Sequence, residues 1–398
     1  MEHAAQHSSA LIPILVFLVV YAAITFELVN KAAAALAGVG VLVVLHITTE
    51  HQAVEHVDFE TLMLLTGMMI LVSLIKKSGF FTIVSVRIAE ITKGSPVKIL
   101  VLFSIVTALM SAFLDNVTTV LIIIPIIIEL TRGMGLDPKN YVLSQALISN
   151  IGGAATLIGD PPNVIIGSKV GLSFNQFIFN LTPAVIPCFI VVLGYIWFIN
   201  RHEFKPINTS MSKLVSVQLL LEKIRFEFAN IRIDQNLMIK SLVCLTFAIL
   251  LFITQTITGL APGVVALGMA MVLLIISQAN VEHVLEEVEW STLLFFTGLF
   301  ILVGVLEDYG VIEWIAHNVF MNIGDNPYVI VLMVLWVSGI ASGFLDNIPF
   351  TIAMIPIIHL MLETNPIPND ILWWALALGA CLGGNITMIG ASANIVSV

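Results

Sequence analysis

The sequence predicts an all-α polytopic membrane protein made of two repeats, and three observations support this fold class. Of the 398 residues, 59% are hydrophobic and 11% are charged, whereas soluble domains carry roughly 25% charged residues. Several apolar runs are about long enough to cross a hydrocarbon core of roughly 30 Å. They cover residues 10–29, 32–48, 59–75, 174–199, 238–258, 262–278 and 290–306. The third observation is that the chain repeats itself, without a gap, at a shift of 231 positions.

The repeat is visible in residues that are rare in apolar chains. The shift of 231 aligns residues 111–116, SAFLDN, with residues 342–347, SGFLDN. It also aligns Gly152, Gly153, Thr156, Gly159 and Asn163 with Gly383, Gly384, Thr387, Gly390 and Asn394. A duplicated apolar chain whose shared residues are polar or helix-breaking is typical of a membrane transporter with its site between two halves. We expect the first repeat at 10–200, a cytoplasmic amphipathic linker at 201–240 and the second repeat at 241–398.

In order along the chain, each half is predicted to contain three apolar spans, a broken apolar stretch, an interrupted span and a last span. In the first half the broken stretch is 97–130, which turns at Asp115, and the interrupted span is 141–170. If the broken stretch is a re-entrant hairpin, each repeat crosses the membrane about five times, and if it spans fully, about seven times. Because both counts are odd, the two repeats must have inverted topology.

The second half ends early in this alignment. Residues 171–200 of the first half would correspond to 402–431, beyond residue 398. We expect that a final span is missing from the sequence, because a chain that ends within an interrupted helix would leave backbone groups unpaired in lipid.

The basic residues predict the orientation in the membrane. All sixteen Lys and Arg lie before residue 241, and such residues collect in cytoplasmic loops. With the N-terminus outside, Lys31, the basic residues of 76–98, and the linker lie on the cytoplasmic side, and only Lys169 lands outside. We therefore expect a multi-pass protein of the plasma (inner) membrane with an exterior N-terminus.

Two shorter segments are predicted to lie along the membrane interface. Residues 80–93 and the corresponding segment around Trp314 look amphipathic and would either link fixed and moving parts or form lateral helices without a mechanical role. Linker residues 206–236 carry apolar residues at helical spacing and are predicted to form a cytoplasmic surface helix.

Asp115 and Asp346 are the first candidates for chemistry, because each lies in a long apolar stretch. A carboxylate there costs on the order of 2.5–3.5 kcal/mol on the more lenient insertion scale, which argues for a use. The alternative is an N-cap that satisfies free backbone N–H groups of the second hairpin arm. Both roles can hold together, since a cap at a buried tip aims a helix N-terminus at the site.

Short amide and hydroxyl side chains follow each acid and suit a small ligand. In the first hairpin they are Asn116, Thr118 and Thr119, and in the second they are Asn347 and Thr351. Pro125 and Pro356 lie farther along the arms, where we expect kinks without a functional role.

The interrupted span of the first half is the strongest local signal. Gly152, Gly153 and Gly159 permit an unwound backbone, and Asp160 precedes two prolines suited to the first turn of a restarting helix. Unwound backbone at membrane depth survives only where protein buries it or where it lines a wet cavity. The copy keeps its glycines and polar residues, namely Gly383, Gly384, Asn385, Thr387, Ser392 and Asn394, but has Ala391 in place of Asp160. Asp160 is therefore the first candidate for proton or cation coupling, with simple capping as the alternative.

The predicted site combines opposing preferences. Helix N-termini favour an anion or a polar neutral solute, whereas carboxylates and free carbonyls favour Na⁺ or H⁺. We expect no Lys or Arg near the site, which argues against a multiply charged organic anion. The chain has no GxxxxGK[ST] motif, so ATP-driven transport would need a separate cytoplasmic ATPase subunit. No nucleophile–base set is visible, and we expect no enzymatic activity, no cofactor and no nucleic-acid partner.

Four motifs in order carry a family resemblance. They are FLDNVTT at 113–119, NIGGAATLIGDPPNVII at 150–166, FLDNIPFTIAMIP at 344–356 and GACLGGNITMIGASAN at 379–394. The chain closely resembles the ion transporter superfamily, within it the group of arsenite-efflux proteins, sodium/proton antiporters and P proteins, and most of all the P-protein type. The resemblance implies inverted repeats with re-entrant hairpins, usually a dimer, elevator-type alternating access, and a site formed by the hairpin tips and the unwound stretches. Dicarboxylate relatives carry Ser-Asn-Thr at the tips, so the Asp-Asn of this chain argues against such substrates.

The leading functional hypothesis is proton-coupled efflux of arsenite or antimonite, with Cys381 supplying a thiol beside the second unwound stretch. The first alternative is Na⁺/H⁺ antiport, in which Asp115, Asp160 and Asp346 bind the exchanged cations. The second alternative is an anion transporter or channel of P-protein type. All three predict a small inorganic solute, a lipid bilayer around the protein and a homodimer.

Overall fold

The chain is described by a computed structural model in which residues 2–26, 28–92, 95–201, 233–320, 326–364, 367, 370–388, 390–391, 393–394 and 397 are placed. These residues form helices and contain no strand. The helices of the first half are α1 (Glu2–Thr25), α2 (Lys31–Val44), α3 (Glu50–Glu55), α4 (Phe59–Lys77), α5 (Phe80–Thr92), α6 (Pro96–Ser111), α7 (Asn116–Gly133), α8 (Lys139–Gly153), α9 (Pro161–Val170) and α10 (Phe174–Ile199).

The helices of the second half follow the linker. They are α12 (Gln235–Ile253), α13 (Gln255–Thr258), α14 (Pro262–Ser277), α15 (Val281–Leu285), α16 (Trp290–Asp308), α17 (Val311–Ile315), the π-helix η1 (Ala316–Phe320), α18 (Pro327–Phe344), α19 (Asn347–Thr364) and α20 (Ile371–Gly383). The predicted linker helix at 206–236 lies outside the described residues for most of its length, because only 233–236 of it are described.

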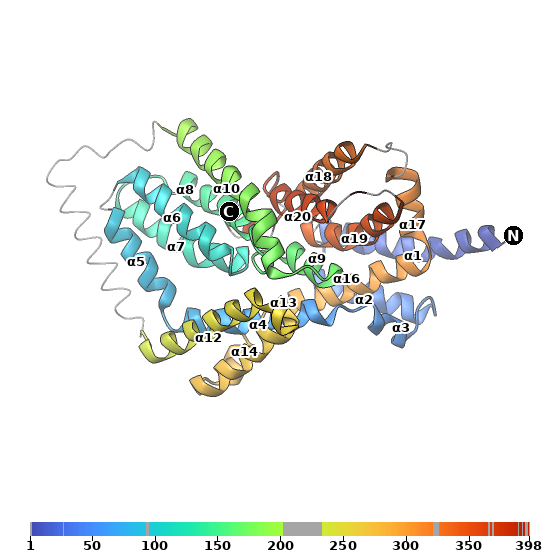
Figure 1. Cartoon of the computed structure of the whole chain (residues 1–398), viewed down its shortest axis with the longest axis horizontal. Helices are drawn as coiled ribbons and strands as arrows, with labels where there is room; N and C mark the ends of the chain where they lie inside the picture. Colours follow the sequence, from blue (N-terminus) through green and yellow to red (C-terminus); the bar gives the residue numbers. More distant parts are fainter. Residues whose placement is uncertain are drawn as a thin grey trace.

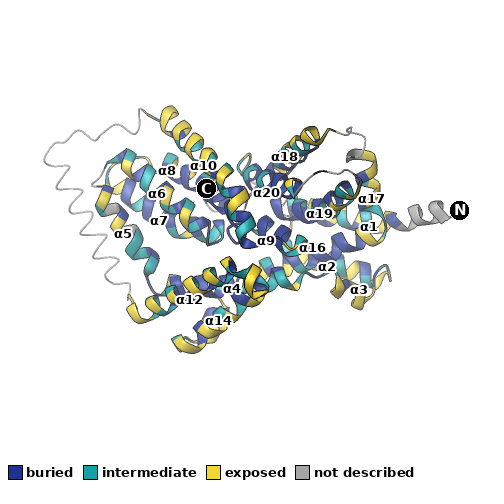
Figure 2. Ribbon diagram, in the orientation of Figure 1, coloured by how far each residue is buried: buried dark blue, intermediate teal, exposed yellow. Residues whose placement is uncertain are grey.

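Six of the described helices are long and apolar enough to cross a membrane. They are α4, α7, α10, α12, α16 and α18. Figure 2 shows exposed residues along α10, α12 and α14, on the outside of the molecule. On α10 these residues include Phe179, Ile190 and Val191, all of them strongly exposed. Apolar side chains turned outward along spanning helices suit a lipid environment, so the predicted polytopic membrane fold is confirmed at this level.

The breaks in the chain fall where the sequence predicts them. The first broken stretch divides into α6 and α7, which we call the first hairpin, with its tip at 112–115. The second hairpin consists of α18 and α19, with its tip at 345–346. The interrupted span divides into α8 and α9, separated by the unwound residues 154–160.

Each half packs a long helix against a helix of the other half. Helix α4 of the first half packs along α14 of the second, and α16 of the second half packs along α2 of the first. The two helix pairs touch at repeat-equivalent residues. Where α4 crosses α14, the backbone of Ala266 fills the position that a Cβ on Gly67 would take, and where α16 crosses α2, a Cβ on Gly298 would lie 2.7 Å from the Cβ of Ala35. Glycine is required at both crossings because the backbones approach so closely.

Figure 1 shows how these pairs are arranged. Helices α2, α4, α12, α14 and α16 lie along one side of the molecule, and the two hairpins with α8 and α20 lie along the other. The predicted lateral segments, α5 and α17 with η1, lie near opposite ends of the molecule. We call the first group the frame and the second group the hairpin bundle.

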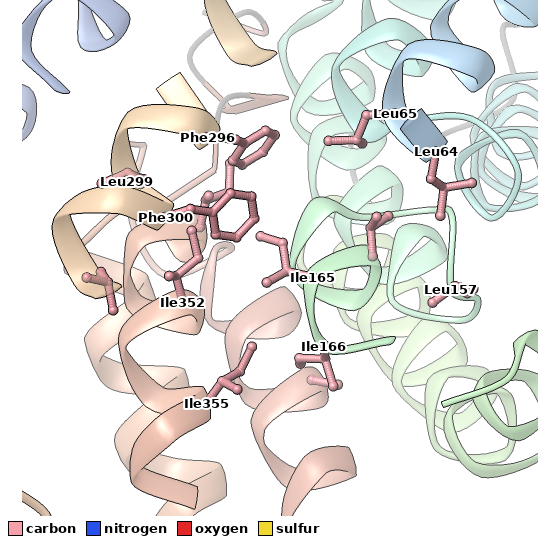
Figure 3. Close-up of a cluster of buried hydrophobic side chains, with 14 of the residues drawn as sticks. Leu64, Leu65, Leu157, Ile165, Ile166, Phe296, Leu299, Phe300, Ile352 and Ile355 are labelled. Carbon is pink, nitrogen blue, oxygen red and sulfur yellow. The ribbon is translucent and has the colours of Figure 1, made fainter. Parts of the chain in front are cut away.

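Helix α9 joins the frame to the hairpin bundle. Its Ile165 and Ile166 are completely buried, as is Phe296 of α16. In Figure 3, Ile165 lies opposite Phe300 of α16, with Ile352 of α19 nearby. This contact with α16 is aliphatic and aromatic, and Ser168 of α9 donates a hydrogen bond to Oδ1 of Asp58, the N-cap of α4, at 2.8 Å, so the position of α9 against the frame depends on packing and on this bond.

Candidate functional site

The two halves meet through a network of asparagine side chains. Asn116 at the start of α7 donates through Nδ2 to Oδ1 of Asn150 on α8, at 2.9 Å. Asn150 in turn donates through Nδ2 to Oδ1 of Asn385, at 2.8 Å, and to Oδ1 of Asn394, at 3.0 Å. The predicted site residues of both halves are therefore brought into one place, and Asn150 is the central link.

Asn163 and Asn394 hold the two unwound stretches in the same way. Asn163 donates through Nδ2 to the carbonyl oxygens of Thr156, at 2.8 Å, and Ala154, at 3.3 Å. Asn394 donates to those of Thr387, at 2.9 Å, and Gly384, at 2.7 Å. Unwound carbonyls need such partners at membrane depth, so both amides act first on the backbone.

Hydroxyl groups tie each hairpin to its neighbouring broken helix. Ser111 donates to the Ser149 carbonyl and Ser342 to that of Ala380, each at 2.6 Å. Thr156 donates to the Ala112 carbonyl and Thr387 to that of Gly343. Each pair is related by the shift of 231 residues, so the duplication extends to individual hydrogen bonds.

The glycines of the unwound stretches serve close approach. A Cβ on Gly152 would lie 2.5 Å from the carbonyl oxygen of Ala108 on α6, and one on Gly153 would lie 2.7 Å from that of Gly159. Gly383 lies against the backbone of Gly339 in the second half. None of these glycines has a positive φ, so the lack of a side chain is what the packing requires.

Asp160 differs from every other polar residue of the site. It occupies the N-cap position of α9 but makes no side-chain cap hydrogen bond, so the prediction of simple capping is wrong. Its side chain is 1% exposed, and neither carboxylate oxygen has a hydrogen-bond partner among the described residues. The Cys381 thiol and the Asn347 amide are close enough to act on it as weak donors, short of normal hydrogen-bond geometry, and Asp115 and Asp346 are close enough to act on it electrostatically.

Asp115 does cap its helix. Its Oδ1 accepts a hydrogen bond from the backbone N–H of Thr118 at 2.8 Å, as the N-cap prediction requires. The same aspartate and Thr118 line a cavity of about 380 Å³ between α4 and the first hairpin, together with Lys76, Glu287 and Glu289. The cap and exposure to a cavity occur together, so the acid is open to a ligand. We call this space the first cavity.

Asp346 at the other tip is paired with a cation. Its Oδ2 lies 2.6 Å from the Nζ of Lys31, which begins α2. The expectation that no Lys or Arg lies near the site is therefore wrong. Lys31 is the only Lys or Arg in the first 75 residues, and this isolated charge between two apolar runs is the signal that could have indicated it, although the distribution of basic residues assigned it to the cytoplasmic side.

The remaining predicted residues have varied surroundings. The Thr119 hydroxyl is buried and has no hydrogen-bond partner among the described residues, whereas Thr351 donates to the Asn347 carbonyl within its own helix. The Cys381 thiol is buried and lies 3.5 Å from Oδ1 of Asn163. Ser392 lies outside the described residues. Glu289 is a further residue that sequence reasoning missed, since it precedes an apolar span as an ordinary helix start does.

A second cavity, of about 340 Å³, lies between α16, α9 and α19. Its polar lining consists of His56, Lys169, Glu307, Glu313, His359 and Glu363. The shift of 231 residues relates several of its residues to the lining of the first cavity: Glu307 corresponds to Lys76, His56 to Glu287 and Ile352 to Leu121. The two cavities therefore occupy repeat-equivalent places, but only the first reaches a hairpin-tip acid.

In the described part of the chain, no three His, Cys, Asp or Glu side chains are arranged to hold a metal ion, and Na⁺ binding at the aspartates stays a prediction.

Comparison with known sequences gives the family. Residues 21–379 match CitMHS, which is described as the citrate transporter family. The chain belongs to this family. Two mycobacterial relatives are similar over nearly their whole length. A 46 kDa membrane protein of Mycobacterium leprae is 39% identical over 97% of this chain and 90% of its own. The uncharacterized transporter Rv2684 of Mycobacterium tuberculosis is 38% identical over 97% of this chain and 89% of its own.

The P protein of Homo sapiens is 34% identical to this CitMHS member over 95% of the chain, which spans about half (54%) of the P protein. The resemblance to P-protein-like members of the ion transporter superfamily is thus confirmed. So is the prediction that the protein is a membrane transporter and not an enzyme.

Proposed function

We propose that this CitMHS member is a secondary active transporter that exports arsenite or antimonite with proton coupling. The family establishes membrane transport, and the proposal concerns the solute, the coupling ion and the motion. The observation that carries it is the Asp160 carboxyl group, which is buried at the junction of the two halves and makes no hydrogen bond of normal geometry among the described residues, with only the Cys381 thiol and the Asn347 amide close enough to act on it as donors.

A buried carboxylate without a donor is costly as a bare anion. It becomes stable when it takes up a proton or a cation, and the nearby charges of Asp115 and Asp346 add to the cost of the empty anionic state. Asp160 is therefore suited to load a coupling proton when the site is open and to release it to a solute or to water in the other state.

The chemistry around Asp160 suits a small neutral hydroxylated solute. The Asn347 amide and the Cys381 thiol are its polar neighbours, and together they offer a donor, an acceptor and a soft sulfur atom. The family's description names citrate, yet three aspartates face the site and Lys31 is already paired with one of them at 2.6 Å. A tricarboxylate would meet net repulsion there.

We further propose inverted repeats that work by an elevator motion, with the hairpin bundle and α9 moving along the frame. The exchanged packing of α2, α4, α14 and α16 and the two repeat-equivalent cavities support an internal two-fold axis in the membrane plane. Aliphatic and aromatic side chains meet where α9 contacts α16 (Figure 3), and sliding there would break the hydrogen bond from Ser168 of α9 to Asp58 at the start of α4. The plasma membrane, an exterior N-terminus and a homodimer belong to the same proposal.

Na⁺/H⁺ antiport is the second candidate, because Asp115, Asp160 and Asp346 are close enough to interact electrostatically. Clustered carboxylates are the ordinary way to exchange protons for hard cations.

The test is flux in proteoliposomes that contain the purified protein and a pH-sensitive dye. An arsenite or antimonite gradient is expected to drive proton movement. Proton movement driven by Na⁺ and not by arsenite would replace the proposal with antiport. Uptake of citrate, or a large current carried by chloride without proton movement, would overturn both.

A further inference from the structure

The ion pair between Lys31 and Asp346 connects the frame to the hairpin bundle. Lys31 is the first residue of α2, and Asp346 lies at the tip of the second hairpin, 315 positions away. The Nζ–Oδ2 distance is 2.6 Å, and the side chains are 33% and 9% exposed. A charge-assisted hydrogen bond this short, with one partner buried, is among the strong kinds and is poorly screened by solvent.

The other half of the molecule lacks this pair. At the position equivalent to Lys31 it has Pro262, the first residue of α14, which carries no charge. Asp115, the equivalent of Asp346, forms no ion pair among the described residues, and Glu289 is a charged neighbour. One tip therefore has a tethered cation, while the other tip faces the first cavity.

Tyr21 on α1 lies near Asp346 but does not pair with it. Its hydroxyl is buried without a hydrogen-bond partner among the described residues, and the charge of Asp346 is close enough to act on it. A neutral hydroxyl cannot balance the charge of Asp346, and among the described residues Lys31 is its ion-pair partner.

We propose that Lys31 is a tethered counter-cation that holds the second hairpin against α2 in this conformation and leaves Asp115 and Asp160 as the acids for the coupling cation. Lys31 is thus a positioning residue. The proposal rests on the proposed motion of the hairpin bundle along the frame, because such a motion separates Lys31 from Asp346. It predicts that the pair stabilises the state in which the first cavity reaches Asp115.

The test compares access to the two cavities in the full chain. Single reporter cysteines replace Leu121, which lines the first cavity, or His359, which lines the second, after Cys188 and Cys244 are changed to Ser. Maleimide labelling rates are measured with and without Lys31→Met. We expect the variant to slow labelling at residue 121 and to accelerate it at residue 359. The ratio of the two rates should change roughly tenfold, as for the loss of one charge-assisted hydrogen bond.

Two further variants keep the result interpretable. Lys139→Met removes another lysine that begins a helix, α8, and it should leave the ratio unchanged. The charge exchange Lys31→Asp with Asp346→Lys should restore the wild-type ratio. Equal acceleration at both reporters would show loss of stability only, and an unchanged ratio would show a passive pair; either outcome overturns the proposal. Labelling needs no solute, so the two proposals can fail separately. If the protein does not transport arsenite but Lys31→Met still changes the ratio of the two labelling rates, the role of Lys31 stands and the proposed solute is wrong.

Discussion

At the scale of single residues, the polar groups of the site divide by what they bind. Asn163 and Asn394 use their amide donors on unwound carbonyls, and Asn150 links the two halves. These side chains are satisfied by protein and keep the backbone open at membrane depth. Among the described residues Asp160 has no partner of normal hydrogen-bond geometry, so its carboxyl group is not explained by a role in holding the backbone.

Replacing Asp160 by Asn should remove proton coupling without harming the fold. The amide has nearly the shape of the acid and carries no charge, so the cost of an unpaired buried carboxylate disappears. We expect dye-reported proton movement to fall to the level of empty liposomes, while the melting temperature in detergent stays the same or rises. A clear fall in melting temperature would instead indicate that the carboxylate supports the structure.

Replacing each hairpin-tip aspartate by Asn should affect stability differently at the two tips. Asp115→Asn keeps a good N-cap for α7, so transport should be lost with stability unchanged. Asp346→Asn should also abolish transport, but it leaves Lys31 without its partner and should lower the stability by about 1–3 kcal/mol. Both variants should express normally. Thermal unfolding and flux, measured on the same preparations, check this; wild-type flux in both variants would remove the tips from the site.

At the scale of elements, the site exists because helices stop and approach one another closely. Helix α6 ends at Ser111, and α8 ends at Gly153 beside it. The Gly152 backbone lies so near α6 that a Cβ would sit 2.5 Å from the Ala108 carbonyl oxygen. Such a contact cannot be relieved by turning a side chain, because the obstacle is backbone.

Gly152→Ala should therefore destabilise the first hairpin. Overpacking of this kind costs about 1–3 kcal/mol of folding free energy. It should also displace Asp115 at the tip of the first hairpin and slow transport. Gly194 on α10 gives a matched control, because a Cβ there would meet nothing within 4 Å. Gly194→Ala should leave transport intact and raise stability by up to about 1 kcal/mol, as alanine does in a helix interior. Equal melting temperatures for the two variants would refute the packing argument.

The breaks between elements were predictable, and the pairings across the molecule were not. Glycine, proline and aspartate mark the interruptions at 112–115 and 154–160 because each acts on the backbone within a few residues. The contact of Lys31 with Asp346 joins residues 315 positions apart, and no local rule reaches that far. Likewise, the sequence places Asp160 before two prolines, where capping is the ordinary outcome, and only the packing shows that its oxygens make no cap and no hydrogen bond of normal geometry among the described residues.

At the scale of the whole molecule, the duplication extends from helices to hydrogen bonds, yet the two halves are not in the same state. Ser111 and Ser342 make equivalent bonds, and α4 with α14 repeats α16 with α2. The tips break the equivalence, since Asp346 is paired with Lys31 while Asp115 faces the first cavity. Two similar halves in different arrangements are suited to alternating access, and because Pro262 stands at the position equivalent to Lys31, the opposite arrangement would lack this ion pair.

Inversion of the repeats makes a prediction that is independent of any solute. Lys76 and Glu307 are repeat-equivalent, both are exposed, and they line the first and second cavities respectively. If the repeats are inverted, the two residues face opposite sides of the membrane; if the repeats are parallel, they face the same side. In intact cells, a membrane-impermeant maleimide should label Glu307→Cys from outside, whereas Lys76→Cys should react only after permeabilisation. The abundance of lysine near residue 76 and its absence after residue 240 assign the cytoplasmic side to the former. Labelling of both from the same side would exclude inversion and, with it, the elevator motion along a shared frame.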